Sequence, residues 1–287
     1  MAEKEIWTTL KVLTWTKEYL LSKGVDNARL EAEWLLCAAT GLDRVGLYMQ
    51  YDKPLNEKEL YDYRAMVSRR ARREPLQHIL GSQEFYGLDF DVCPDVLIPR
   101  HDTEVLITQV LAHCPAAKLV LDVGTGSGCI AITLKKHLPD AHVTAIDISS
   151  AALLIAGQNA KKLGVEIDLR EGSLFAPVVG CQFDVIVSNP PYIPSAHISE
   201  LDQEVRDFDP LIALDGGTDG LDIYRTLIPS AWQYLNTGGW LFVEIGIGQE
   251  HDVQQLFQQT ERYDKPIIIP DPAGIKRVVG AQRKSEV

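Results

Sequence analysis

Hydrophobic residues in the first 80 positions recur at the spacing of amphipathic helices. The run Trp7, Leu10, Leu13 has the three-residue interval that places apolar side chains on one face of a helix. Glycines interrupt this pattern twice, and a further helical segment, NEKELYDYRAMVSRRARR, begins shortly after Pro54. The pattern predicts several short helices packed as a bundle, and we assign residues 1–82 to an N-terminal helical domain.

The pattern changes at residues 84–98, EFYGLDFDVCPDVLI. Phe85 stands before Gly87, and Leu88 and Phe90 follow it, which is typical of two short strands joined by a turn. We therefore expect a β-hairpin linker over residues 83–100.

Strand-like apolar runs alternate with helical stretches from residue 101 onward. This alternation favours a parallel sheet with helices on both faces and with ligands at the carboxyl ends of its strands. We expect an α/β, Rossmann-like domain over residues 101–287, with a seven-stranded, mostly parallel sheet. The expected strands are Lys118–Val123, His142–Ile146, Glu166–Arg170, Phe183–Val187, Trp240–Ile245, Pro266–Ile269 and Lys276–Gly280.

Charge and composition narrow the function. The chain of 287 residues carries a formal charge of -12, whereas its first 80 residues are close to neutral. Tight binding of bare nucleic acid needs Lys and Arg to displace counterions, so we expect no stable nucleic-acid partner. The chain has no run of 18 apolar residues, and its acidic start is unlike a signal peptide, so we expect a cytoplasmic protein.

The cysteines and histidines give no sign of a metal centre. No CxxC pair occurs, and no histidine cluster lies near a cysteine at ligand spacing, so we predict no metal site. This distribution indicates neutral thiols in a reducing compartment. The five cysteines are Cys37, Cys93, Cys114, Cys129 and Cys181.

A glycine-rich segment, LVLDVGTGSGCIAITLKKHLP, has the order strand, loop, helix. Gly124, Gly126 and Gly128 allow positive φ and close approach of a ligand, and the following helix offers free N–H groups. The dinucleotide fingerprint G-x-G-x-x-G is absent, because a cysteine follows the third glycine directly. Asp122 precedes the loop, and Asp147 ends the next strand, where a carboxylate can accept both ribose hydroxyls.

An acid before GxGxG and a second acid after the next strand resemble the pattern of class I methyltransferases. In that pattern the loop passes beside the methionyl part of S-adenosylmethionine, where no pyrophosphate needs room. A nucleotide-binding fold of another kind is the alternative on these residues alone.

The segment Ser188-Asn189-Pro190-Pro191-Tyr192 follows the expected fourth strand directly. Its two prolines fix φ and remove two N–H donors, so the nearby carbonyls can only accept hydrogen bonds. Asn189 precedes a proline and is therefore held extended, with its side chain outside any helix. The Asn189 side-chain oxygen and the Pro190 carbonyl can then accept both hydrogens of a planar –NH₂ group, and Tyr192 offers a flat face for stacking.

These acceptors suit methyl transfer to a planar nitrogen, whose conjugated lone pair makes it a weak nucleophile. Holding both hydrogens fixes the nitrogen for in-line attack and stabilises the positive charge that develops on it. We predict Asn189, Pro190, Pro191 and Tyr192 as catalytic residues, without a side-chain general base. A rigid proline turn without chemistry is the alternative.

Six segments together resemble the HemK/PrmC family of protein-(glutamine-N5) methyltransferases, which modify peptide chain release factors. The segments are PLQHILGSQEFYGLDFDV (75–92), LIPRHDTE (97–104), LDVGTGSGCIAI (121–132), VSNPPYIP (187–194), ALDGGTDGLDIYR (213–225) and GGWLFVEIGIGQ (238–249).

The resemblance implies methyl transfer from S-adenosylmethionine to the glutamine amide in the Gly-Gly-Gln motif of class I release factors. It also implies that the helical domain helps to recognise the release factor, and we expect a monomer. The position where the family often has an aromatic residue falls at or beside Leu174, and Phe175 follows it. His101 and Asp102 replace the usual Pro-Glu of LIPRPETE. The implied cofactor contacts are Asp122, Gly124, Thr125, Gly126, Ser127, Gly128, Asp147, Leu174 and Asn189.

Other substrates remain open from the residues alone. A sister enzyme methylates a glutamine of a ribosomal protein, and NPPY also serves enzymes that methylate amino groups of adenine or guanine in nucleic acid. Residues 200–222 hold eight acids and one arginine, a balance that disfavours nucleic acid. Within them we expect Glu200, Asp202, Glu204, Asp207 and Asp209 to form an acidic rim that attracts a basic protein loop. Solvation of a loop by these acids is the alternative. The cluster Arg69–Arg73 is either a docking patch or a solvated helix end.

Overall fold

The computed structural model describes residues 6–285, and the chain divides into two compact units. Unit 1 comprises Met1–Gly81 with Asp202–Phe208, and unit 2 comprises Ser82–Leu201 and Asp209–Val287. The outermost residues of the two domains assigned from the sequence lie outside the described residues. Residues 202–208 were assigned from the sequence to the second domain, but they group with the helices of unit 1.

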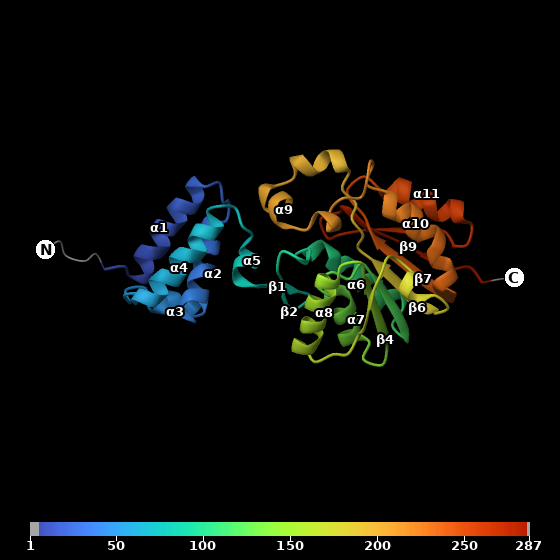
Figure 1. Ribbon diagram of the computed structural model, residues 1–287, viewed down its shortest axis with the longest axis horizontal. Coiled ribbons are helices and arrows are strands. Elements are labelled where there is room, and N and C mark those ends of the chain that lie inside the picture. Colours follow the sequence, from blue (N-terminus) through green and yellow to red (C-terminus); the bar gives the residue numbers. More distant parts are fainter. Residues whose placement is uncertain (1–5, 286–287) are drawn as a thin grey trace. The chain divides into compact units, whose positions relative to one another are not determined.

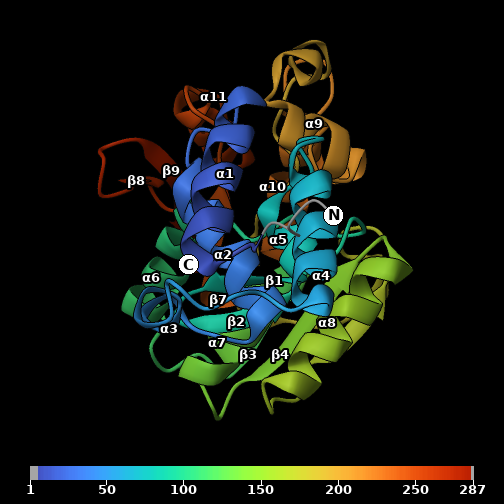
Figure 2. The same ribbon diagram turned by 90° about the vertical axis from the view of Figure 1, so that its left-hand side faces the viewer.

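Unit 1 is built from short helices, and Figure 2 shows α1, α2 and α4 side by side. Asn56 begins α4 with a capping box, in which its side chain accepts from the Glu59 N–H and the Glu59 carboxylate accepts from the Asn56 N–H. Buried side chains such as Leu20, Leu35 and Val67 form the core. The helices are α1 (Thr9–Ser22), α2 (Ala28–Thr40), α3 (Arg44–Met49), α4 (Glu57–Arg70), α5 (Leu76–Leu80) and α9 (Gln203–Phe208).

Arg70, at the end of α4, is only 2% exposed. Its guanidinium is paired with Glu31 and, at 2.7 Å, with Glu204 of α9. Arg73 contacts the same Glu204 carboxylate at 2.9 Å. A buried guanidinium needs such carboxylate partners, because an uncompensated charge is costly away from water. Arg70 and Arg73 therefore belong to an internal ion-pair network, and neither alternative considered for the cluster Arg69–Arg73 describes them.

Unit 2 begins with an antiparallel hairpin and continues into a mixed sheet. The described residues contain a seven-stranded sheet in the order β5-β4-β3-β6-β7-β9-β8. The five neighbouring strands β5, β4, β3, β6 and β7 are parallel to one another. Strand β9 runs antiparallel to both of its neighbours, β7 and β8. The predicted α/β fold with a mostly parallel sheet is confirmed. The strands are β1 (Ser82–Phe85), β2 (Leu88–Asp91), β3 (Leu119–Val123), β4 (His142–Asp147), β5 (Asp168–Glu171), β6 (Phe183–Ser188), β7 (Leu235–Glu244), β8 (Ile267–Pro270) and β9 (Lys276–Gln282).

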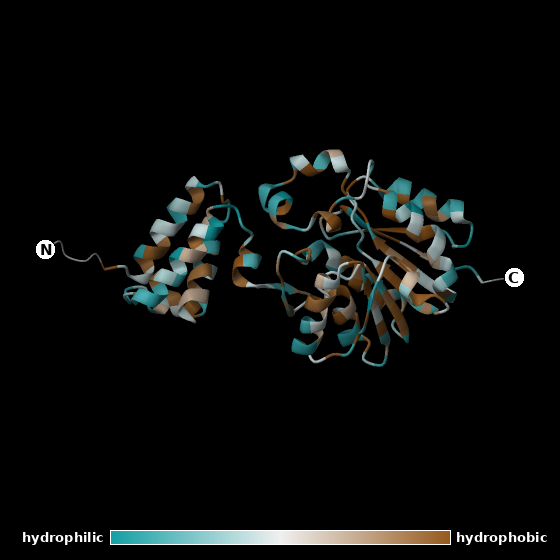
Figure 3. Ribbon diagram, viewed as in Figure 1, coloured by the Kyte–Doolittle hydropathy of each residue, from teal (hydrophilic) through white to brown (hydrophobic). Residues whose placement is uncertain are grey.

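Helices cover both faces of this sheet (Figure 1). Val120 and Val185 pack with α6 and α7 on one face, whereas Leu121 and Ile186 pack with α10 and α11 on the other. The inner strands β3, β4 and β6 are accordingly mostly hydrophobic, and Figure 3 shows brown strands in the middle of the sheet. The helices are α6 (Glu104–His113), α7 (Cys129–His137), α8 (Ser150–Lys162), α10 (Asp222–Ala231) and α11 (Glu250–Thr260), with short 3₁₀ turns η1 (His101–Thr103), η2 (Ala176–Val178), η3 (Ser195–Glu200), η4 (Leu211–Ala213) and η5 (Trp232–Tyr234).

Strands β3 and β6 are neighbours although β4 and β5 lie between them in sequence. The strand order therefore reverses at this pair, and such a switch point is where open α/β sheets bind ligands. Ser188, at the end of β6, donates from Oγ to the carbonyl oxygen of Val123, at the end of β3, over 2.7 Å. This hydrogen bond joins the start of the glycine loop to the start of the Asn-Pro-Pro-Tyr segment.

Candidate active site

The glycine loop between β3 and α7 uses its three glycines in two ways. Gly124, Gly126 and Gly128 have φ of 76°, 56° and 82°, in the left-handed region that favours glycine. A Cβ at Gly124 or Gly126 would meet nothing within 4 Å. A Cβ at Gly128 would lie 2.9 Å from Cδ1 of Ile132 and 3.1 Å from Cβ of Ala156. The first two glycines therefore keep space open, and the third allows α7 to pack closely on α8.

Asp147 holds this loop from the end of β4. Its Oδ2 accepts from the N–H of Gly126 at 2.8 Å, and its Oδ1 accepts from the N–H of Ser149 at 2.9 Å. A carboxylate oxygen has two lone pairs, so each oxygen can still accept from one further donor. Asp147 is thus able to fix the loop and to bind two hydroxyl groups.

Asp122 lies beneath the loop and is fully buried. Its Oδ2 accepts from Oγ1 of Thr125 at 2.6 Å and from the N–H of Ala131 at 3.2 Å, whereas Oδ1 has no hydrogen-bond partner. Burial raises the pKa of this carboxyl to about 7, although both hydrogen bonds favour the charged form. Asp122 therefore shapes the loop from inside the protein.

A cavity of about 240 Å³ lies at the carboxyl ends of β3, β4 and β6. Three of the predicted site residues do not line this cavity, namely Asp122, Gly128 and Tyr192. Leu174 does line it, from a turn after β5 in which its φ is 49°. The predicted residues brought together around the cavity are Gly124, Thr125, Gly126, Ser127, Asp147, Leu174, Asn189, Pro190 and Pro191.

Asn189 is held by a threonine that sequence reasoning did not identify. Its Nδ2 donates to Oγ1 of Thr103 at 3.1 Å. Thr103 is buried at the start of α6, and its hydroxyl makes no helix-capping bond. Glu244, at the end of β7, is 2% exposed, and its Oε2 has no hydrogen-bond partner. Burial raises the pKa of Glu244 to about 7. The only feature of the sequence that pointed to Thr103 or Glu244 was that each lies in a segment resembling the HemK/PrmC family.

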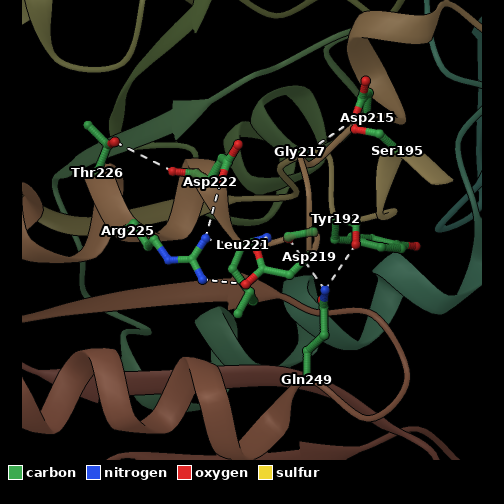
Figure 4. A network of polar contacts seen from close by, with 11 residues as sticks. Tyr192, Ser195, Asp215, Gly217, Asp219, Leu221, Asp222, Arg225, Thr226 and Gln249 are labelled. Atoms are coloured by element: carbon green, nitrogen blue, oxygen red, sulfur yellow. Dashed lines mark hydrogen bonds and ion pairs between the residues drawn. The ribbon is translucent and has the colours of Figure 1, made fainter. Parts of the chain in front are cut away.

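The backbone of the tetrapeptide Asn189-Pro190-Pro191-Tyr192 is held by segments distant in sequence (Figure 4). Gln249 donates from Nε2 to the carbonyl oxygens of Tyr192 at 2.9 Å and Gly220 at 3.3 Å. Its Oε1 accepts from the N–H of Gly246 at 2.9 Å. A Cβ at Gly220 would overlap the carbonyl of Tyr192, so only glycine fits at this approach. Residues of the segments ALDGGTDGLDIYR and GGWLFVEIGIGQ therefore fix the backbone of the tetrapeptide at Tyr192.

Three of the acids that follow the Asn189–Tyr192 segment are paired within the chain. Asp209 is buried and contacts Arg100 at 2.6 Å, and Asp207 contacts Arg206 at 2.8 Å. Glu204 is paired with two arginines of unit 1. Neighbouring arginines therefore compensate three of the five acids of the predicted rim, so Glu204, Asp207 and Asp209 are not free to attract a basic loop as predicted.

Two family descriptions match this chain. Residues 11–81 match the PrmC N-terminal domain, and residues 101–205 match the methyltransferase small domain. Over 283 residues the chain is 57% identical to the release factor glutamine methyltransferase of Geobacter sulfurreducens, with 98% of this chain and 99% of that relative covered. The chain belongs to the release factor glutamine methyltransferase family. A family member from Koribacter versatilis is 42% identical over 265 residues, which cover 91% of this chain and 94% of that relative.

Membership of the release factor glutamine methyltransferase family confirms the predicted family and enzyme class. It implies S-adenosylmethionine as the methyl donor, whereas the individual residue contacts stay predictions. A methyltransferase from Pyrococcus furiosus has the same fold, with a TM-score of 0.52 and 19% identity over 70% of this chain and 91% of that chain. Among the described residues, no helix is long and apolar enough to cross a membrane, and no group of three or more side chains is arranged to hold a metal ion.

Proposed function

We propose that this chain transfers the methyl group of S-adenosylmethionine to the side-chain amide nitrogen of the glutamine in the Gly-Gly-Gln motif of class I peptide chain release factors. The observation that carries the proposal is that the glycine loop Gly124–Ser127 and the segment Asn189–Pro191 line one cavity. The relatives described above are release factor glutamine methyltransferases, which supports the choice of substrate. Unit 1 is proposed to help recognise the release factor.

The proposed reaction takes place in the cytoplasm, where release factors act. We infer a monomeric enzyme without a stable nucleic-acid partner. The formal charge of -12 supports the second inference, since an acidic chain repels a phosphate backbone.

The cavity residues fit S-adenosylmethionine. The open space at Gly124 and Gly126 admits a ligand against the backbone, and Asp147 keeps acceptor capacity for two ribose hydroxyls. Leu174 and Ile148 add apolar lining that suits a purine ring. When bound, this group supplies an electrophilic methyl on a sulfonium, and these residues hold it in place.

Asn189 and Pro190 are proposed to hold the substrate nitrogen. The NH₂ group of Asn189 is engaged by Thr103, which leaves its Oδ1 to accept one hydrogen of the glutamine amide. The Pro190 carbonyl accepts the other hydrogen. Tyr192 was predicted to stack on the amide plane but does not line the cavity, so it has no part in this proposed grip. Two fixed acceptors favour the positive charge that grows on nitrogen as the N–C bond forms. The methylated nitrogen then loses a proton to solvent, so no side-chain base is required.

The test is transfer of labelled methyl groups from S-adenosylmethionine to purified release factor, followed by mass mapping of the modified residue. Label is expected only on the glutamine of the Gly-Gly-Gln motif. A release factor in which alanine replaces that glutamine is the control and should stay unlabelled. Labelling of ribosomal proteins or of nucleic acid, with release factor unlabelled, would overturn the proposal.

A variant of the tetrapeptide tests the chemistry. Asn189→Ala should lower kcat by about a hundredfold or more, the usual effect of removing one preorganised transition-state partner. The Kd for S-adenosylmethionine, measured by calorimetry, should change much less. Near-normal turnover in this variant would contradict the two-acceptor arrangement.

A further inference from the structure

The side chain of Gln249 points at the main-chain carbonyl of Tyr192, as Figure 4 shows. Its Nε2 donates to this carbonyl and to that of Gly220, and its Oε1 accepts from the N–H of Gly246. A backbone carbonyl only accepts and a backbone N–H only donates, so these partners decide which end of the carboxamide is NH₂. Gln249 stands at the N-cap of α11 but makes no side-chain capping bond there, so its polar atoms serve the tetrapeptide instead of its own helix.

Glycines let the main chains of two segments meet at this point. A Cβ at Gly220 would overlap the carbonyl oxygen of Tyr192 and would lie 2.7 Å from Nε2 of Gln249. A Cβ at Gly216 would lie 2.8 Å from the carbonyl oxygen of Pro191. The main chain around these glycines therefore packs directly against the end of the tetrapeptide, and Gln249 joins the two segments through their carbonyls.

The two prolines of the tetrapeptide leave few ways to anchor its backbone. Neither has an N–H group, so donors must come from other segments. The Pro190 carbonyl is the acceptor assigned above to the substrate and must stay free. Before the prolines, Ser188 donates from Oγ to the Val123 carbonyl at 2.7 Å, and after them Gln249 donates to the Tyr192 carbonyl at 2.9 Å. Because φ is fixed at both prolines, anchors on either side of them determine where the carbonyl between them points.

We propose that Gln249 is a positioning residue for methyl transfer, which holds the Tyr192 carbonyl and thereby sets the direction of the Pro190 carbonyl. Pro190 lines the cavity and Gln249 does not, so Gln249 acts on a substrate only through the tetrapeptide. The inference rests on the proposed function only where it assigns the Pro190 carbonyl to the substrate nitrogen, because the hydrogen bonds of Gln249 are a property of the protein alone. A misplacement of about 1 Å at a reacting group can lower a rate by about a hundredfold.

The first measurement needs neither donor nor substrate. Tyr192-Ile193 is the only Tyr-Ile pair in the chain, so protein labelled at tyrosine carbonyl carbons and at isoleucine nitrogens gives a single carbonyl–amide correlation. The Tyr192 carbonyl resonance should move in Gln249→Met, which removes the NH₂ donor and keeps an unbranched side chain. Gln255→Met, at an exposed position of the same helix, is the matched control and should leave the resonance in place.

The second measurement uses the methylation assay. In Gln249→Met, kcat should fall by roughly tenfold to a hundredfold, expressed per S-adenosylmethionine site counted by calorimetry so that unfolded protein does not contribute. The Kd for S-adenosylmethionine and the KM for release factor should stay within about twofold of wild type, because the lost contact acts at the reacting nitrogen. Gln255→Met should keep the wild-type values.

A third variant, Gln249→Glu, makes the same contact depend on pH. The charged carboxylate only accepts and would face two carbonyl oxygens, whereas the protonated carboxyl can donate to Tyr192 while its other oxygen still accepts from Gly246. The ratio of kcat in this variant to kcat in wild type should therefore rise as pH falls, and the Tyr192 carbonyl resonance should return toward its wild-type position over the same range. Wild type carries the neighbouring titratable groups Asp219, Glu250 and Tyr192 as well, so the ratio removes their effect.

Gln255→Glu adds the same charge to α11 and should give a ratio that does not change with pH. An unmoved Tyr192 resonance or an unchanged kcat in Gln249→Met would overturn the inference. If Gln249→Met does not fold, Gln249→Glu decides, and a ratio that stays constant while the Tyr192 resonance moves with pH is the contrary result. A Tyr192 resonance that responds to Gln249→Met, in a protein whose wild type does not methylate release factor, would overturn the proposed function alone.

Discussion

The glycine loop predicts that the same added methyl group has different effects at two positions. In Gly128→Ala, the φ of 82° costs about 1–2 kcal/mol for any residue with a Cβ. The new Cβ would also lie 2.9 Å from Ile132 and 3.1 Å from Ala156, and overpacking of this kind adds about 1–3 kcal/mol. In Gly124→Ala, with φ of 76° and nothing within 4 Å, only the backbone cost of about 1–2 kcal/mol applies.

Two assays on the same variants separate these effects. Urea denaturation should give a loss of unfolding free energy of roughly 2–5 kcal/mol for Gly128→Ala and of at most about 2 kcal/mol for Gly124→Ala. Calorimetry should nevertheless give weaker binding of S-adenosylmethionine to Gly124→Ala, because its methyl group enters the space kept open beside the loop. Equal losses of stability at the two positions, or unchanged affinity in folded Gly124→Ala, would refute this reasoning.

Three further substitutions test the charged groups. Asp147→Asn should weaken binding of S-adenosylmethionine by about 1.5–3 kcal/mol in calorimetry, because an NH₂ group would face a backbone N–H; unchanged affinity would remove Asp147 from the site. Arg70→Leu should lower the unfolding free energy by about 3 kcal/mol, the lower part of the range for a broken buried ion pair, since both carboxylate partners are partly exposed. A loss no larger than that of exposed Arg72→Leu would contradict the network. Asp122 has a folded-state pKa of about 7, above its unfolded value, so the folded state keeps a proton that the unfolded state releases and stability falls as pH rises toward 7. Between about pH 5 and 8 the unfolding free energy of wild type should fall by about 2–3 kcal/mol through Asp122, and Asp122→Asn should remove this fall. If the unfolding free energies of variant and wild type changed with pH in parallel, the raised pKa of Asp122 would be contradicted.

Local patterns predicted the elements of the sheet, because a buried parallel strand is apolar along its whole length. β7 shows where such reasoning fails. The sequence placed its start at Trp240, but the strand begins at Leu235. Gly238 and Gly239 are typical of a turn, yet here they lie inside a strand whose pairing with β6 changes register before Trp240.

The site was predicted as far as its residues are neighbours in sequence. The glycine loop and Asn189–Pro191 carry their chemistry in contiguous motifs, and the cavity brings them together. Gln249 contacts Tyr192 only because β7 lies beside β6, and no local pattern encodes that contact. The pairing of Glu204 with Arg70 spans 134 residues and is equally invisible, which is why the sequence could not show that the Glu204 charge is compensated.

Pro190 and Pro191 line the cavity next to Asn189 and contribute no N–H group to its wall. In the proposed reaction, such a wall selects for the chemical state of the substrate. A glutamate produced by deamidation presents two acceptor oxygens to two acceptors, so a damaged release factor would be rejected. The methylated glutamine keeps a single amide hydrogen and satisfies only one of the two acceptors. The same absence of donors thus excludes the deamidated side chain, weakens binding of the product and limits the modification to one methyl group.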